Sequence, residues 1–264
     1  MKKRVISAIV ALAIFIPIAI IGGNLFNIAF YILAMLGLKE FLKIYDKKVP
    51  DFIQIIAYLM LTFIYFLNTV KGNLTINMDL RIMAGLFLTL FLPVVLYHDP
   101  KTYSIKDAFY FLGGIYFISS SFSMFGLYRK EGLSVLVFLF LITILTDTFA
   151  YITGSLIGKN KLLENISPNK TWEGTIGGSL IATFVCSIYY FTVISEAASV
   201  PVIVLMILFL TLIGQFGDLF FSAIKRNYGV KDFSNIMPGH GGILDRFDSI
   251  IFVMLAFSFF ITII

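Results

Sequence analysis

Long apolar runs dominate this chain and strongly limit the folds open to it. Most are near or above the length of about 18 residues that is typical of a membrane-spanning helix. Hydrophobic residues make up 59% of the sequence and charged residues 13%, whereas a soluble domain carries about 25% charged residues. The sequence therefore predicts an all-α, polytopic integral membrane protein with about nine transmembrane helices, at residues 5–22, 25–38, 52–70, 80–97, 108–127, 132–157, 174–195, 200–225 and 248–264.

The first apolar run resembles a signal peptide, because it follows the basic start MKKR. No small-residue cleavage site follows it and further apolar runs come at once, so we interpret it as an uncleaved first span. Cys186 is the only cysteine and lies within an apolar run, which excludes an intrachain disulfide and a cysteine-based metal site.

The basic residues predict the orientation in the membrane. With the N-terminus in the cytosol, 16 of the 20 Lys and Arg residues fall on the cytosolic side and 4 on the other. This split favours a cytosolic N-terminus and an odd number of spans, in the inner (cytoplasmic) membrane. The net charge of +5 therefore indicates membrane orientation, and no nucleic acid partner is expected. The segment LKEFLKIYDKK (38–48) is expected to continue as an amphipathic helix on the cytosolic surface, as an anchor near anionic headgroups.

The spans fall into two predicted regions. Residues 1–130 form the N-terminal membrane helices, and residues 131–264 form a C-terminal catalytic region with two polar cytosolic loops. The first loop is GKNKLLENISPNKTWEG (158–174), and the second extends from Lys225 to Asp248. Each follows a span that contains an acidic residue, although a charge within a bilayer costs about 2.5–3.5 kcal/mol.

Those two acids are Asp147 and Asp218. For Asp147, a buried acid bonded to a neighbouring helix and a substrate-binding role both remain open. For Asp218 a functional role is favoured, because Ser222 and Lys225 follow it at helical spacing and lie on the same helix face. The polar residues that follow are Arg226, Lys231, His240, Asp245, Arg246 and Asp248.

This set is suited to phosphate chemistry with a metal. Carboxylates from two segments, without a His/Cys cluster, favour a hard cation such as Mg²⁺, and Asp218, Asp245 and Asp248 are the candidate ligands. Neighbouring Lys and Arg side chains would neutralise phosphates. Gly241 and Gly242 would let the backbone approach the substrate, or form a tight turn. Three roles remain open for His240: acid–base catalysis, phosphate binding and a structural role in the turn.

The run SAIKRNYGVKDFSNIMPGHGGILDRFDS (222–249) closely resembles the signature of the phosphatidate cytidylyltransferase, or CDP-diacylglycerol synthase, family. The upstream run DTFAYITGSLIGKNKLLENISPNKTWEGTIGG (147–178) also resembles this family. One position departs from the pattern, because Asn169 stands where a basic residue is expected. The resemblance is strong over about residues 145–250, and before that it is compositional.

The resemblance implies a Mg²⁺-dependent nucleotidyltransferase that joins CTP to phosphatidic acid and releases CDP-diacylglycerol and pyrophosphate. It also implies a homodimer in the bilayer and metal ligands at Asp218 and Asp245, while a second metal or a monovalent cation stays open. We expect catalytic roles for Asp218, Asp245, Lys225 and His240. The expected substrate-binding residues are Asp147, Lys170, Ser222, Arg226, Lys231, Gly241, Gly242 and Arg246.

Two other functions compete with this hypothesis. A transporter or channel would use Asp147 and Asp218 in an ion pathway, but it would not explain the polar glycine-rich loop. Another membrane phosphotransferase would share the phosphate chemistry, yet the spaced Asp pattern of CDP-alcohol phosphotransferases is missing.

Overall fold

The computed structural model describes residues 2–45, 47–71, 80–195, 199–237, 239 and 241–260. In these residues, nine α-helices correspond to the nine apolar runs, which confirms the helical fold class. The elements are α1 (Lys2–Ile21), α2 (Gly23–Lys43), α3 (Asp51–Lys71), α4 (Leu80–Tyr97), α5 (Ile105–Glu131), α6 (Leu133–Ile157), β1 (Lys161–Leu163), β2 (Ser167–Thr171), α7 (Trp172–Tyr189), the π-helix η1 (Tyr190–Ile194), α8 (Val200–Asn227) and α9 (Leu244–Phe257).

Six helical segments among the described residues are long and apolar enough to cross a membrane. They are Gly23–Lys43, Asp51–Thr69, Ile105–Glu131, Leu133–Ile157, Trp172–Ile194 and Val200–Asn227. The 14 residues of α9 would extend only about 21 Å, less than the hydrocarbon core of about 30 Å. The end of the last predicted span, residues 261–264, lies outside the described residues. A multi-pass membrane protein is thus confirmed, while the count of nine spans and the cytosolic N-terminus stay predictions.

The chain forms two compact units. The first contains Met1–Leu127 and Phe233–Ile243, and the second contains Tyr128–Asp232 and Leu244–Ile264. The first unit therefore includes most of the glycine-rich segment between α8 and α9. The division into regions 1–130 and 131–264 was made by function, and it stays a prediction.

In the first unit, aromatic rings join α2 to α5. The Phe30 and Phe125 rings stack with centroids 4.3 Å apart, and those of Phe41 and Tyr110 stack at 4.5 Å. The Tyr110 hydroxyl also donates to the Phe41 carbonyl at 2.7 Å. The structure differs from the surface helix expected over 38–48, because α2 ends at Lys43 and buries Glu40.

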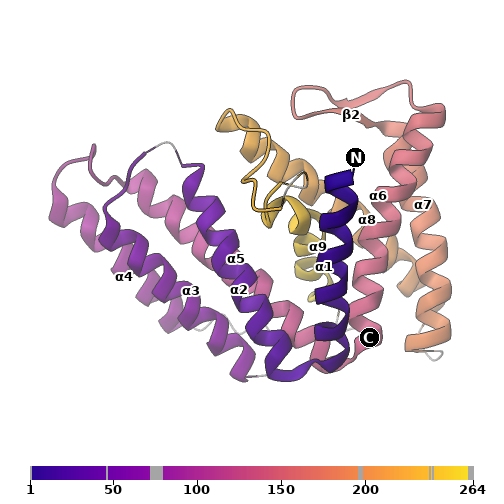
Figure 1. Ribbon diagram of the computed structural model, residues 1–264, viewed down its shortest axis with the longest axis horizontal. Helices are drawn as coiled ribbons and strands as arrows, with labels where there is room; N and C mark the ends of the chain where they lie inside the picture. The colour runs from indigo at the N-terminus through magenta and orange to yellow at the C-terminus, as the bar shows by residue number, and fades with distance from the viewer. Residues whose placement is uncertain are drawn as a thin grey trace. The chain divides into compact units, whose positions relative to one another are not determined.

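In the second unit, α6 and α7 approach each other closely through small residues (Figure 1). A Cβ atom on Gly178 would lie 2.7 Å from the backbone nitrogen of Ala150, and one on Gly174 would lie 2.7 Å from its carbonyl oxygen. A Cβ on Gly177 would lie 2.8 Å from the Thr153 side chain. Membrane helices associate largely through such close van der Waals packing, so these glycines determine the spacing of the pair.

A β-hairpin connects α6 to α7, where the sequence predicts a polar loop. Strands β1 and β2 are antiparallel, with Lys161 opposite Thr171 and Leu163 opposite Ser167. Thr171 then begins α7 as its N-cap, because its hydroxyl accepts the Gly174 N–H at 3.1 Å. Figure 1 shows the hairpin beyond the adjoining ends of α6 and α7. The strands are short, and neither KLL nor SPNKT has the alternating apolar pattern that predicts a strand.

We predict that Gly178→Ala destabilises the protein, since the added methyl would collide with the α6 backbone. Overpacking of this kind costs about 1–3 kcal/mol. Gly113→Ala in α5 is the matched control, because a Cβ there meets nothing within 4 Å. Thermal unfolding in detergent should show a lower midpoint for Gly178→Ala and an unchanged or higher one for Gly113→Ala. Equal midpoints would contradict the close packing.

Candidate active site

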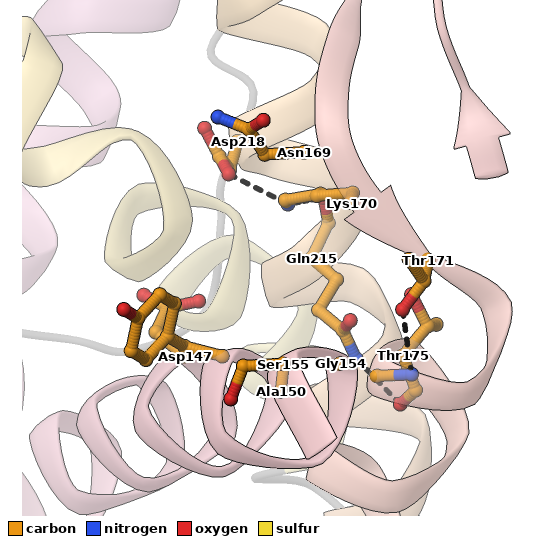
Figure 2. Close-up of a pocket in the computed structure, with 12 residues that line it drawn as sticks. Asp147, Ala150, Gly154, Ser155, Asn169, Lys170, Thr171, Thr175, Gln215 and Asp218 are labelled. Carbon is orange, nitrogen blue, oxygen red and sulfur yellow. Dashed lines mark hydrogen bonds and ion pairs between the residues drawn. The ribbon is translucent and has the colours of Figure 1, made fainter. Parts of the chain in front are cut away.

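A cavity of about 460 Å³ that contains charged side chains lies in the second unit, lined by α6, β2, α7 and α8 (Figure 2). Helix α6 contributes Asp147 and Tyr151, β2 contributes Asn169 and Lys170, and α8 contributes Gln215 and Asp218. The cavity therefore brings together the acidic residues of two predicted spans and the polar loop between α6 and α7. The sequence placed these groups on one side of the membrane, and the structure adds that they share one cavity.

An ion pair across the cavity joins Lys170 to Asp218, at 2.6 Å between Nζ and Oδ2. The two side chains are 22% and 29% exposed, so the pair is partly accessible to a ligand. Figure 2 shows the side chains pointing towards each other. The Ser222 hydroxyl donates to the other Asp218 oxygen at 3.4 Å, in agreement with the predicted shared helix face.

Two further carboxylates lie within electrostatic range of this pair. Asp147 interacts with Asp218, Lys170 and Arg246, and Asp248 interacts with Asp218, Asp147 and Lys225. Where these three acids are ionised they repel one another, and repulsion between charges is stronger away from bulk water. A bound cation would relieve this repulsion.

Lys225 and Asp245 form a second ion pair, which joins α8 to α9. The distance from Lys225 Nζ to Asp245 Oδ1 is 2.6 Å, and the side chains are only 9% and 2% exposed. Helical spacing places Lys225 beside Ser222, but it does not reveal this partner 20 residues later. The structure therefore distinguishes two acids that the sequence treats alike: Asp245 has a buried cationic partner, whereas Asp218 faces the cavity.

The remaining basic residues have different surroundings. Arg226 donates to the Ile166 carbonyl at 3.4 Å and to the Val230 carbonyl at 3.2 Å, which ties the turn of the hairpin to the segment after α8. Lys231 and Arg246 are exposed. Their predicted contacts with phosphate stay predictions.

The predicted glycine-rich segment is only partly described. Gly241 and Gly242 are buried in the first unit, and Gly241 has a φ of 85°, which favours glycine. His240 lies outside the described residues. The structure therefore does not test its predicted catalytic role, nor the predicted contact of the two glycines with substrate.

The acidic cluster fits a Mg²⁺ ion that is completed by substrate. Among the described residues, no three His, Cys, Asp or Glu side chains are grouped closely enough to hold a metal alone. Mg²⁺ rarely needs such a cage, because it is usually bound through one or two carboxylates plus waters and substrate phosphates. Asp218, with Asp248 in electrostatic range, supplies donors of the right kind.

Gln215 is a cavity residue that the sequence analysis missed. It is buried, and its amide donates to the Ser179 hydroxyl at 2.8 Å and to the Thr175 carbonyl at 3.2 Å. The Lys170 ammonium also donates to its backbone carbonyl at 3.5 Å. A glutamine within an otherwise apolar run is itself a signal, because polar groups within spans are costly. Asn169, noted for its departure from the family pattern, also lines the cavity.

Comparisons with known proteins identify the family to which the chain belongs. The model of the cytidylyltransferase family matches residues 2–264. The phosphatidate cytidylyltransferase of Staphylococcus haemolyticus is 39% identical over 254 residues, which cover 96% of each chain. Proteins of the same name from Staphylococcus saprophyticus and Staphylococcus aureus are 37% and 39% identical, again over 96% of each chain. With a family match along almost its whole length, the chain belongs to the cytidylyltransferase family.

Proposed function

We propose that this protein transfers the cytidylyl group of CTP to phosphatidic acid in phospholipid biosynthesis. The observation that carries this proposal is the meeting of Lys170 and Asp218 in a partly open cavity among membrane helices, in a chain 37–39% identical to phosphatidate cytidylyltransferases. One substrate has acyl chains and comes from the bilayer, while the other is a water-soluble polyanion. A cavity that contains charged side chains and lies among apolar helices can receive both.

In the proposed reaction, a phosphate oxygen of phosphatidic acid attacks the α-phosphorus of CTP. A new P–O bond forms, and the bond from the α-phosphorus to the oxygen that bridges to the β-phosphorus breaks. Pyrophosphate leaves with that electron pair, and the product is CDP-diacylglycerol. The attacking phosphate is already anionic near neutral pH, so the chain needs no strong general base.

The chain's own contribution is the positioning and neutralisation of charge. Lys170, on β2, would neutralise triphosphate oxygens, and Arg246 would add a second positive charge near Asp147. Asp218, Asp245 and Asp248 remain the proposed metal ligands. Of these, Asp218 is favoured, because it lines the cavity and is 29% exposed, whereas Asp245 is almost fully buried against Lys225. A bound Mg²⁺ would stabilise negative charge on the triphosphate.

We also propose that the cavity faces the cytosol in a cytoplasmic membrane and that the N-terminus is cytosolic. The unequal distribution of 16 and 4 basic residues supports this orientation. A homodimer is implied by the family resemblance and stays a prediction.

The first test of the function is a cytidylyl-transfer assay with the purified full-length protein. Radiolabelled CTP, phosphatidic acid vesicles and Mg²⁺ should together give a lipid-soluble labelled product and pyrophosphate. Omission of phosphatidic acid or chelation of the metal should abolish both products. Ion flux through liposomes without nucleotide, together with no transfer, would instead support the transporter hypothesis.

The second test is Asp218→Asn, which keeps the side-chain shape but removes the charge that pairs with Lys170. We expect turnover to fall by about 10²-fold or more, because electrostatic stabilisation at the reacting phosphates depends on this cluster. Asp51→Asn, at an exposed position in the first turn of α3, is the control and should retain normal turnover. Near-normal turnover of folded Asp218→Asn would remove Asp218 from the metal role.

The third test separates stability from catalysis at the Lys225–Asp245 pair. Asp245→Asn should lower the free energy of unfolding by about 3–5 kcal/mol, because the Lys225 ammonium loses its buried carboxylate partner. The double variant Lys225→Met/Asp245→Leu should recover much of that loss, as measured by thermal unfolding, yet remain inactive. An active double variant would show that the pair is only structural.

A further inference from the structure

We propose that Glu40, near the end of α2, is a positioning residue for the glycine-rich loop between α8 and α9. We define this loop as residues 233–243, which belong to the first compact unit together with α2. The inference adds a role for the N-terminal helices, and its catalytic part rests on the proposed cytidylyl transfer. Nothing in the family resemblance over residues 145–250 points to this residue.

Glu40 makes direct contacts with both ends of the loop. Its Oε1 atom accepts the Ser234 hydroxyl at 2.6 Å and the Ile243 backbone N–H at 2.8 Å, so it bridges residues nine positions apart. The residue as a whole is 1% exposed. A buried carboxylate is costly unless hydrogen bonds compensate it, and bonds to a charged acceptor are roughly twice as strong as neutral ones. The two bonds therefore close the loop firmly.

Gly242 fits against the same carboxylate. A Cβ atom at this position would lie 2.6 Å from both Glu40 oxygens, so only glycine lets the chain pass this closely. Gly239 and Gly241 have φ values of 80° and 85°, and the Met237 N–H donates to the Gly241 carbonyl at 3.0 Å. Gly239 and Gly241 thus adopt backbone conformations that favour glycine, and Glu40 occupies the space that a side chain on Gly242 would need.

Glu40 holds the backbone N–H of Ile243, the residue that directly precedes the next helix. Ile243 directly precedes Leu244, the first residue of α9, and Asp245 follows as the partner of Lys225. Displacement of Ile243 would shift Asp245 along with it. Since misplacement by about 1 Å can cost about 10²-fold in rate, loss of the Glu40 contact should lower turnover without removing any group that contacts substrate.

The direct structural test is backbone hydrogen exchange, measured by mass spectrometry on the full-length protein. In Glu40→Ala, the amides of the loop up to Ile243 should exchange at least about 10-fold faster than in the wild type. Glu40→Gln keeps one acceptor oxygen, so its exchange rates should lie between those of Glu40→Ala and the wild type. Ser234→Ala, which removes one donor, should show a smaller increase in the exchange rate. It replaces Glu40→Ala as the test variant if Glu40→Ala fails to fold. Exchange at the wild-type rate in all three variants would overturn the proposal.

The kinetic test asks whether this ordering matters for catalysis. Per folded enzyme, Glu40→Ala should lower kcat by about 10- to 100-fold and leave the KM for CTP within about two-fold, while Glu40→Gln recovers most of the loss. Asp51→Asn is the control for charge removal in the same unit. Faster loop exchange with unchanged kcat would show that the contact is merely structural and would overturn the catalytic part.

A double-mutant cycle tests the contact itself. Gly242→Ala alone should be strongly impaired, because its methyl group collides with the Glu40 carboxylate. Added to Glu40→Ala, the same change should lower kcat by no more than about two-fold further. Fully additive effects would contradict the contact. If the wild type shows no CTP-dependent transfer, the proposed function has failed, and the exchange measurements alone decide whether Glu40 orders the loop.

Discussion

The close approach of α6 and α7 is the constraint on which the cavity depends. Between these helices the hydrophobic effect contributes little inside a bilayer, so close packing of small residues must hold them together. Gly174, Gly177 and Gly178 allow α7 to lie almost against the α6 backbone. The hairpin that joins the two helices is therefore short and fixed at both ends. Its second strand carries Lys170 to Asp218 on α8.

The second unit contains two ion pairs that differ in their exposure to solvent. Lys225 and Asp245 are almost fully buried and neutralise each other between α8 and α9. Lys170 and Asp218 are partly exposed in the cavity, with Asp147 and Asp248 in electrostatic range. In the proposed reaction, an incoming triphosphate with its metal would exchange partners with the outer pair, while the inner pair joins α8 to α9. This division would let one region be both stable and reactive.

Much of the fold could be predicted from the sequence, because apolar length alone specifies a membrane helix. Each predicted span has a counterpart helix, although α2 extends past the predicted end at residue 38 to Lys43. The hairpin could not be predicted, since SPNKT has no alternating apolar pattern and its pairing depends on the closely spaced ends of α6 and α7. Helix spacing correctly placed Ser222 beside Asp218. The partners Lys170 and Asp245 come from other elements, and one sequence contains no signal for such pairs.

The hydrogen bonds of Glu40 to Ser234 and Ile243 affect which fragments of this protein can keep an ordered loop before α9. A fragment that begins at Tyr128 would keep every residue of the two ion pairs at the cavity and between α8 and α9. It would nevertheless lack the carboxylate that closes the loop before α9, because that group comes from a helix about 200 residues earlier. On the proposed role of Glu40, the amino-terminal half is more than a membrane anchor. A minimal version of the protein, or a chimera of two relatives, should then keep α2 and the glycine-rich loop from the same parent.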